Sequence, residues 1–193
     1  MIKAGKTFGQ GVELSHLFAA QELGAGLKLS AQTPTRKMKL KGNLLTFDER
    51  LSHGKTGQQM FVNAARKAGF IMQEAEGKFL PFDFYSPTND HFYEVKYDPR
   101  AYQYNNVFVE TLRNDPVQGW IDYGIAASRA DVWAFVTDRD VVTIYKQALY
   151  NILVQSTSSC KFEELTGEVD KIEKKRWRVP ITLIGSRGEI WQL

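Results

Sequence analysis

The sequence contains a single cysteine, Cys160, among 193 residues, so it allows no intrachain disulfide and a reducing compartment is expected. Its three histidines, His16, His53 and His91, are far apart, which together with the single cysteine excludes a zinc finger. No apolar run approaches the ~20 residues that cross a bilayer. The first residues also lack the apolar stretch of a signal peptide. These absences predict a cytoplasmic protein with no membrane partner.

The sequence also lacks a large excess of either charge. The net charge of +3 is too small to indicate a nucleic-acid partner by itself, although basic residues are concentrated before residue 48 and near the C-terminal end. A hydrophobic content of 43% and an aromatic content of 12% are typical of a globular protein. We expect a single domain over residues 1–193, with a basic extension at 1–50, a core at 55–137 and a C-terminal strand, helix and basic segment at 138–193.

The hydrophobic pattern predicts an α/β order of elements. A helix is expected to begin near Lys55, where Thr56 and Gln59 have capping-box spacing, and to end at Gly69. The dipeptide Asp115-Pro116 predicts another helix start. The expected strands are 70–72, 79–85, 91–97, 107–111, 131–136 and 141–145, and the further helices or helical turns are 115–128 and 147–155.

Two short segments place charged side chains inside apolar strands. The first is Pro81-Phe82-Asp83 and the second is Glu94-Val95-Lys96, with turn-forming residues at 86–90 between them. Side chains alternate between faces along a strand, so Glu94 and Lys96 project together and Val95 points into the core. A hairpin would bring Asp83 beside Glu94. Two such carboxylates can hold a divalent ion, and a lysine beside them can orient or activate a water.

These segments resemble the motif of the PD-(D/E)xK nuclease superfamily, which includes restriction endonucleases, junction resolvases and recombination exonucleases. The resemblance covers residues 55–137, because the superfamily core is a helix, a three-strand meander, a helix and a closing strand. It implies a restriction-endonuclease-like core in which a central mixed β-sheet is flanked by helices. Asp83 would lie on the second strand, and Glu94 and Lys96 on the third. The sequence departs from the motif in having Phe82 between Pro81 and Asp83.

The resemblance also implies a role for each residue of the two segments. Asp83 and Glu94 would be ligands of Mg²⁺ or Mn²⁺, with the backbone carbonyl of Val95 as a third ligand. Lys96 would position the attacking water and stabilise the charge that builds on the phosphate. The alternative is an ordinary surface ion pair between Glu94 and a neighbouring lysine, worth about 1 kcal/mol or less.

A further metal ligand is left open by the sequence. Many superfamily members add an acidic residue from the first helix, where this sequence has Gln58 or Gln59. We interpret Gln59 as a helix-capping residue. Glu110 and Glu49 are the alternatives for an additional ligand. Asp131 precedes a buried strand, and we expect it to anchor the loop there rather than to bind metal.

Clusters of basic and aromatic residues are candidates for contacts with DNA. Lysine and arginine neutralise phosphates, and aromatic rings stack on bases. The alternative is that the basic runs are solvated strand edges and the tyrosines are sheet packing. The candidates are Lys37, Lys39, Lys41, Arg100, Tyr102, Tyr104, Arg113, Lys174, Lys175, Arg176, Trp177 and Arg178.

The resemblance and the basic clusters together predict a metal-dependent DNA nuclease that acts as an endonuclease in recombination, repair or phage-type replication. Many nucleases of this kind are dimers, so a homodimer is compatible with this prediction. Two other functions stay open. One is a non-catalytic DNA-binding or assembly protein that uses the same basic surface, and the other is an RNA-directed nuclease.

Overall fold

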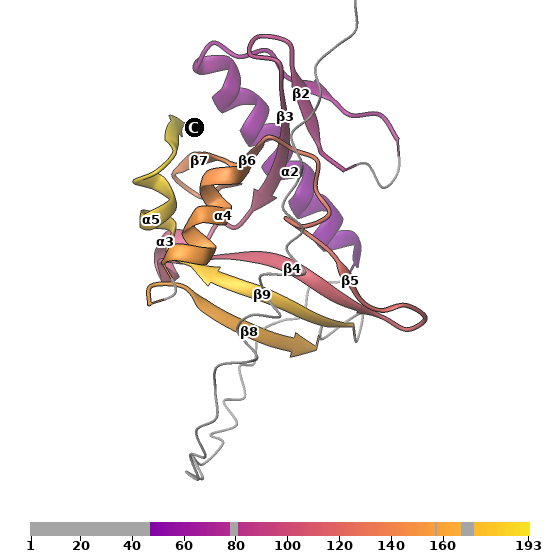
Figure 1. Ribbon diagram of the computed structural model, residues 1–193. Helices are drawn as coiled ribbons and strands as arrows, with labels where there is room; N and C mark the ends of the chain where they lie inside the picture. Colours follow the sequence, from indigo (N-terminus) through magenta and orange to yellow (C-terminus); the bar gives the residue numbers. More distant parts are fainter. Residues whose placement is uncertain (1–46, 78–80, 157, 167–171) are drawn as a thin grey trace, which may run out of the picture. The chain divides into compact units, whose positions relative to one another are not determined.

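The computed structural model describes residues 47–77, 81–156, 158–166 and 172–193 (Figure 1). The chain divides into two units, Met1–Asn43 and Leu44–Leu193, and the described residues belong to the second. Most of the predicted basic extension, with its candidates Lys37, Lys39 and Lys41, therefore lies outside the described residues. Within the described ranges, no helix is long and apolar enough to cross a membrane.

Sheet A is a mixed sheet. Its strands are β1 (Gln73–Glu74), β2 (Phe84–Ser86), β3 (His91–Tyr97), β6 (Val132–Val136), β7 (Asp140–Tyr145) and β10 (Glu189–Gln192). They lie in the order β1-β2-β3-β6-β7-β10. The first three form an antiparallel meander, and β3 then pairs in parallel with β6, which forms a hairpin with β7. A three-strand meander and a closing strand were predicted from the sequence, although the first meander strand lies at 73–74 rather than at 70–72.

Sheet B is antiparallel and carries the C-terminal basic run. Its strands are β4 (Val107–Asp115), β5 (Gly119–Asp122), β8 (Lys161–Thr166) and β9 (Glu173–Val179), in the order β5-β4-β9-β8. A bulge interrupts the pairing of β4 with β9 between Glu110 and Leu112. The strands β4 and β5 occupy the connection between β3 and β6, where the superfamily core would have a helix.

The described helices are α2 (Phe47–Lys67), α3 (Ala101–Tyr104), α4 (Lys146–Gln155) and α5 (Ile181–Gly185). The helix α2 packs against β3, and both α4 and α5 pack against β7 (Figure 1). The fold is therefore a mixed α/β fold with a central mixed sheet flanked by helices, which confirms the predicted fold class.

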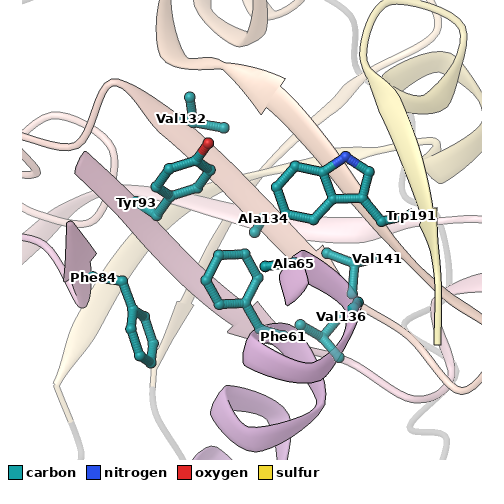
Figure 2. Close-up of a cluster of buried hydrophobic side chains, with 10 residues drawn as sticks. Phe61, Ala65, Phe84, Tyr93, Val132, Ala134, Val136, Val141 and Trp191 are labelled. Carbon is teal, nitrogen blue, oxygen red and sulfur yellow. The ribbon is translucent and has the colours of Figure 1, made fainter. Parts of the chain in front are cut away.

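The core between α2 and sheet A is built around Phe61 (Figure 2). Its ring centroid lies 5.3 Å from that of Phe84, 5.6 Å from Tyr93 and 6.0 Å from Trp191. Tyr93 is buried in this core and Val95 packs against it. Because side chains alternate along a strand, the burial of these residues directs Glu94 and Lys96 to the opposite face of sheet A.

The first helix begins earlier than predicted. It starts at Phe47 rather than near Lys55, so Thr56 and Gln59 lie in the middle of the helix. The Thr56 hydroxyl donates to the carbonyl of Ser52 at 3.1 Å, and the Gln59 amide donates to the side chain of Asn63 at 3.3 Å. The interpretation of Gln59 as a capping residue was wrong, because capping-box spacing does not mark a helix start when helical residues precede it.

The helix predicted from Asp115 to Ser128 was also wrong. The structure has the hairpin of β4 and β5 there, with Asp115 paired with Gly119. The Asp115 carboxylate accepts the backbone N–H groups of Val117 and Gln118 at 2.9 and 3.0 Å, and Gly119 has a φ of +74°. An aspartate followed by proline opens a tight turn as readily as a helix. The positive-φ glycine then returns the chain as a strand.

The other elements follow the sequence prediction with shifted ends. The strands predicted at 91–97, 131–136 and 141–145 and the helix at 147–155 correspond to β3, β6, β7 and α4. The segment predicted as a strand at 70–72 is irregular, with Phe70 and Met72 packed on the core, and β1 follows it. The strand predicted at 79–85 is β2, which begins only after Asp83, while residues 78–80 lie outside the described residues. The elements α3, α5, β5, β8, β9 and β10 were not predicted.

Candidate active site

Asp83 lies beside β3, at the point where the preceding chain joins β2. Its backbone N–H donates to the carbonyl of Tyr93 at 2.8 Å, which continues the pairing of Phe84 with Tyr93. Its carboxylate Oδ2 accepts the backbone N–H of Val95 at 2.7 Å. These two bonds place the Asp83 carboxyl group next to Glu94, which confirms the contact predicted from a hairpin.

Glu94 and Lys96 form an ion pair on the same face of β3. The Lys96 Nζ lies 2.5 Å from Glu94 Oε1, and the two side chains are 43% and 15% exposed, respectively. The ammonium group also lies 5.4 Å from the ring centroid of the buried Trp133, whose strand β6 pairs with β3. The ion pair considered as the alternative to a metal site is thus present in the structure. It joins one residue of the predicted motif to another and lies directly beside Asp83.

The pKa values of Asp83 and Lys96 are both raised in this cluster. Burial, followed by the negative charge of Glu94, raises the pKa of Asp83, against the opposing effects of the Val95 N–H and of Lys96. Burial lowers the pKa of Lys96, but the charges of Glu94, Asp83 and Glu110 outweigh it and the pKa is raised. The cluster therefore favours an additional positive charge next to its carboxylates.

The donor groups at this position suit a hard divalent cation. Among the described residues, no group of three or more His, Cys, Asp or Glu side chains is arranged to hold a metal ion. Asp83 and Glu94 supply two carboxylates. Because the N–H of Val95 points to Asp83 and a strand residue directs both its backbone groups to the same neighbour, the Val95 carbonyl points to that side too. Mg²⁺ keeps several waters, so this set is sufficient.

The two candidates for a further ligand differ in position. Glu110 lies on β4, and its charge contributes to the raised pKa of Lys96. Its Oε1 lies 3.8 Å from the Nζ of Lys174. Glu49 lies in the first turn of α2, and its side chain is outside what the structure describes. The structure thus links Glu110 to the cluster around Lys96.

Asp131 anchors a loop, as predicted. Its Oδ2 accepts the backbone N–H of Phe92 at 2.9 Å, and its own N–H donates to the Phe92 carbonyl at 2.8 Å. The same loop contains Ser128, whose hydroxyl lies 3.1 Å from the Pro81 carbonyl and 3.4 Å from Glu94 Oε2.

Sequence reasoning missed two residues near Glu94, namely Ser128 and Lys146. The Lys146 ammonium donates a hydrogen bond to the Ser128 carbonyl. Neither residue belongs to the two motif segments. The one signal available was that Lys146 is a charged residue directly after a strongly apolar strand, but such a residue is equally common at a solvated helix start.

The candidate DNA contacts on β9 alternate between the two faces of sheet B. Arg176 and Arg178 lie on the face of Phe108, with the Arg176 guanidinium 3.6 Å from the centroid of that ring, and both pair with Glu163 at 3.2 and 2.5 Å. Glu110 pairs with Arg176 across the strands, so it belongs to the same face. Trp177 points the other way, is 7% exposed and packs on Phe162.

The remaining basic candidates contact aromatic rings. Lys175 pairs with Glu164 at 3.1 Å and lies 4.7 Å from the ring of Trp120, which is 40% exposed. Both Lys174 and Arg113 lie over Tyr123, at 5.8 and 5.2 Å.

The two candidate tyrosines of α3 also contact arginines. Arg100 is 5.6 Å from the ring of Tyr104, which is 54% exposed. The hydroxyl of Tyr102 donates to Asp140 at 2.9 Å, and Arg139 lies over its ring at 4.0 Å. Tyr102 is therefore held in the fold, whereas Tyr104 offers an open ring face.

Comparison with known proteins adds little to these observations. No protein-family model and no curated protein matches the chain. One solved structure, described as a bacterial homing endonuclease, is similar with a TM-score of 0.39 and 15% sequence identity, over 50% of this chain and 69% of that chain. A similarity at this level carries no functional conclusion for this chain, and membership of the PD-(D/E)xK superfamily stays a prediction.

Proposed function

We propose that this chain is a metal-dependent nuclease that hydrolyses phosphodiester bonds in DNA. The observation that carries the proposal is the cluster of Asp83, Glu94 and Lys96, in which a carboxyl group just before β2 lies beside the carboxylate and ammonium groups of β3. A cluster that raises the pKa of Asp83 through burial and the charge of Glu94 is suited to receive a cation.

In this proposal the chain's own groups bind and orient. Asp83, Glu94 and the Val95 carbonyl would hold Mg²⁺ or Mn²⁺, with Glu110 as the candidate for an additional ligand. When bound, such an ion lowers the pKa of water and neutralises charge on phosphate oxygens. Lys96, released from its pair with Glu94, would donate to the scissile phosphate and stabilise its developing charge.

The side chains around the cluster favour a polyanionic substrate. Arg176 and Arg178 share a face of sheet B with Glu110, whose charge reaches Lys96. A phosphate backbone crossing this face would exchange the Glu163 carboxylate for its own phosphates at both arginines. We further propose endonuclease action in recombination, repair or phage-type replication, and cutting of closed circular DNA tests the endonuclease part of this proposal.

The test is cleavage by the purified chain with Mn²⁺, Mg²⁺ or EDTA. The substrates are supercoiled plasmid, linear duplex, single-stranded DNA, a four-way junction and a single-stranded RNA. We expect cutting of closed circular DNA with either metal, no cutting in EDTA, and loss of cutting in Glu94→Gln. Cutting of RNA alone would replace DNA as the substrate. Tight DNA binding without cleavage in any metal would favour a non-catalytic DNA-binding protein.

A further inference from the structure

We propose that Ser128 and Lys146 are positioning residues that fix the spacing between Asp83 and Glu94. Neither residue belongs to the predicted motif, and both lie in or next to the connection that leads into and out of the β6–β7 hairpin. This inference rests on the proposed function, because the spacing matters for holding a divalent ion between the two carboxylates.

The Ser128 hydroxyl lies between the chain segment that carries Asp83 and the side chain of Glu94. Ser128 is only 7% exposed. Its Oγ is 3.1 Å from the carbonyl of Pro81 and 3.4 Å from Glu94 Oε2, and it accepts the N–H of Ala130 at 3.2 Å. A hydroxyl has one hydrogen, so it donates to one of these two oxygens at a time. In either case the buried Ser128 Oγ sets the distance between the Pro81 carbonyl and Glu94 Oε2.

The loop that contains Ser128 makes a second hydrogen bond to the segment before Asp83. The backbone N–H of Arg129 donates to the Pro81 carbonyl at 2.8 Å. This carbonyl therefore receives a rigid backbone donor as well as the hydroxyl of Ser128. The position of Asp83, two residues further along, follows the position of residues 128–129.

Lys146 holds this loop from the far side of the β6–β7 hairpin. Its ammonium donates to the Ser128 carbonyl, and its backbone N–H donates to the Asp131 carbonyl at 2.8 Å. Asp131 in turn accepts the backbone N–H of Phe92, two residues before Glu94. Lys146 thus spans both ends of the loop, and the loop contacts β3 as well as the Pro81 carbonyl.

Both oxygens of Glu94 have a protein partner in this arrangement. Oε1 pairs with Lys96 and Oε2 lies next to the Ser128 hydroxyl. A partner that stays in place, here the Ser128 hydroxyl, orients a carboxylate toward a metal, and removal of such a partner typically costs about 10- to 100-fold in metal affinity or activity. Loss of the hydroxyl would leave Glu94 Oε2 free to rotate away from Asp83, so the main effect falls on metal affinity.

The experiment measures Mn²⁺ binding to the full chain by calorimetry without DNA, and cleavage rate against Mn²⁺ concentration. We expect Ser128→Ala to raise the Mn²⁺ Kd about tenfold or more. Its cleavage should recover at high Mn²⁺, and Ser128→Thr should restore binding because it keeps a hydroxyl. Lys146→Met should raise the Kd in the same direction, with a smaller change in Lys146→Arg, which retains a cationic donor.

Matched controls separate positioning from a general loss of fold. Ser186→Ala removes a hydroxyl that bonds the Leu183 carbonyl outside this cluster, and Lys67→Met removes a lysine at the end of α2. Both controls should bind Mn²⁺ as the parent does. Circular dichroism and melting in EDTA identify any variant that does not fold, in which case Ser128→Cys and Lys146→Gln replace Ser128→Ala and Lys146→Met.

Two results would overturn the inference, and they differ. If the parent binds Mn²⁺ and folded Ser128→Ala and Lys146→Met bind it with a Kd within twofold of the parent, the positioning role fails while the proposed function stands. If the parent itself binds no Mn²⁺ and Glu94→Gln is indistinguishable from it, the proposed function fails and the positioning role fails with it.

Discussion

The fold holds the carboxyl group of Asp83 where its negative charge is disfavoured. Burial and the nearby charge of Glu94 raise the pKa of Asp83, so the folded chain binds a proton there more readily than the unfolded chain does. Its contribution to the free energy of unfolding is full below the ordinary pKa of 3.8 and is lost as the pH rises through the raised value. At neutral pH the ionised Asp83 lowers stability, as a carboxylate that binds a cation in the proposed site would.

Replacing Asp83 by asparagine should therefore stabilise the metal-free chain. The amide oxygen of Asp83→Asn can still accept the Val95 N–H, while the charge beside Glu94 is removed. We expect the Tm in EDTA at pH 7 to rise by a few degrees, with the difference shrinking toward pH 4. Added Mn²⁺ should raise the Tm of the parent and not that of the variant. A Tm at pH 7 below that of the parent would contradict this account.

Lys96 should matter for chemistry more than for DNA binding. Its ammonium faces Glu94 and lies between that carboxylate and Trp133, so it can contact a single phosphate. Loss of one preorganised donor to developing charge costs roughly 100- to 1000-fold in rate. We expect this loss in single-turnover cleavage by Lys96→Ala, with a DNA Kd within about threefold of the parent, since one phosphate contact adds little to the affinity. Undiminished cleavage would remove Lys96 from the active site.

At the scale of the element, α2 and β3 approach each other closely at one glycine. A Cβ added to Gly57 would lie 2.4 Å from Cβ of Tyr97, whereas a Cβ added to Gly54 would meet no atom within 4 Å. Gly57 thus permits the contact that seats α2 against the strand carrying Glu94 and Lys96. Gly54 only lowers the helix propensity of α2.

This difference predicts opposite effects of two alanine substitutions in one helix. Gly57→Ala should force α2 away from β3 and lower the free energy of unfolding by about 1–3 kcal/mol. Gly54→Ala should raise it by up to about 1 kcal/mol, because alanine is the better helix former. Urea unfolding of both variants measures the two changes. Equal changes in the free energy of unfolding would show that the chain accommodates a Cβ next to Tyr97 without loss of stability.

How far the sequence predicts an element depends on how strong its local pattern is. The strands at β3 and β6 were predicted because each carries a run of apolar and aromatic residues, and Glu94 and Lys96 could be placed on one face by their spacing of two. The β4–β5 hairpin was missed because Asp115 followed by Pro116 suits both a helix start and a turn. The pairing of β4 with β5, for example of Asn114 with Trp120, distinguishes them, and that pairing is a contact between strands.

The residues Ser128 and Lys146, which support the site, could not be predicted from the sequence for the same reason. Ser128 and Lys146 approach Glu94 only because β6 pairs in parallel with β3 and the β6–β7 hairpin then returns Lys146 to Asp131. No spacing of nearby residues in the sequence predicts that Ser128 and Lys146 lie close to Glu94. The motif residues Asp83 and Glu94, by contrast, are joined by one short hairpin.

At the scale of the whole molecule, the net charge of +3 does not show how basic and acidic side chains are paired. The arginines of β9 are engaged by Glu163, a side chain that is only 16% exposed and contacts both Arg176 and Arg178. A nucleic acid bound as proposed would have to compete with this carboxylate for the two arginines. The glutamate would therefore weaken nonspecific binding across the face of sheet B.

Neutralising Glu163 should consequently strengthen DNA binding. In Glu163→Gln both arginines are free to bind phosphates, each adding about 0.9 to the magnitude of the slope of log Kobs against log salt. We expect a lower Kd and a slope steeper by up to about 2 in fluorescence anisotropy with a short duplex. The double variant Arg176→Gln/Arg178→Gln should weaken binding and flatten the slope. Slopes unchanged in both variants would mean that this face does not contact DNA.

The chain passes repeatedly between its two sheets. It builds β1 to β3 in sheet A, β4 and β5 in sheet B, β6 and β7 in sheet A, β8 and β9 in sheet B, and β10 again in sheet A. Ending the chain at any of the first three passages leaves both sheets incomplete, and ending it at the last removes β10 from sheet A. The proposed active site and the proposed nucleic-acid-binding face of sheet B therefore cannot be separated as fragments. They should unfold in one cooperative transition, and only point substitutions can take one activity away and leave the other.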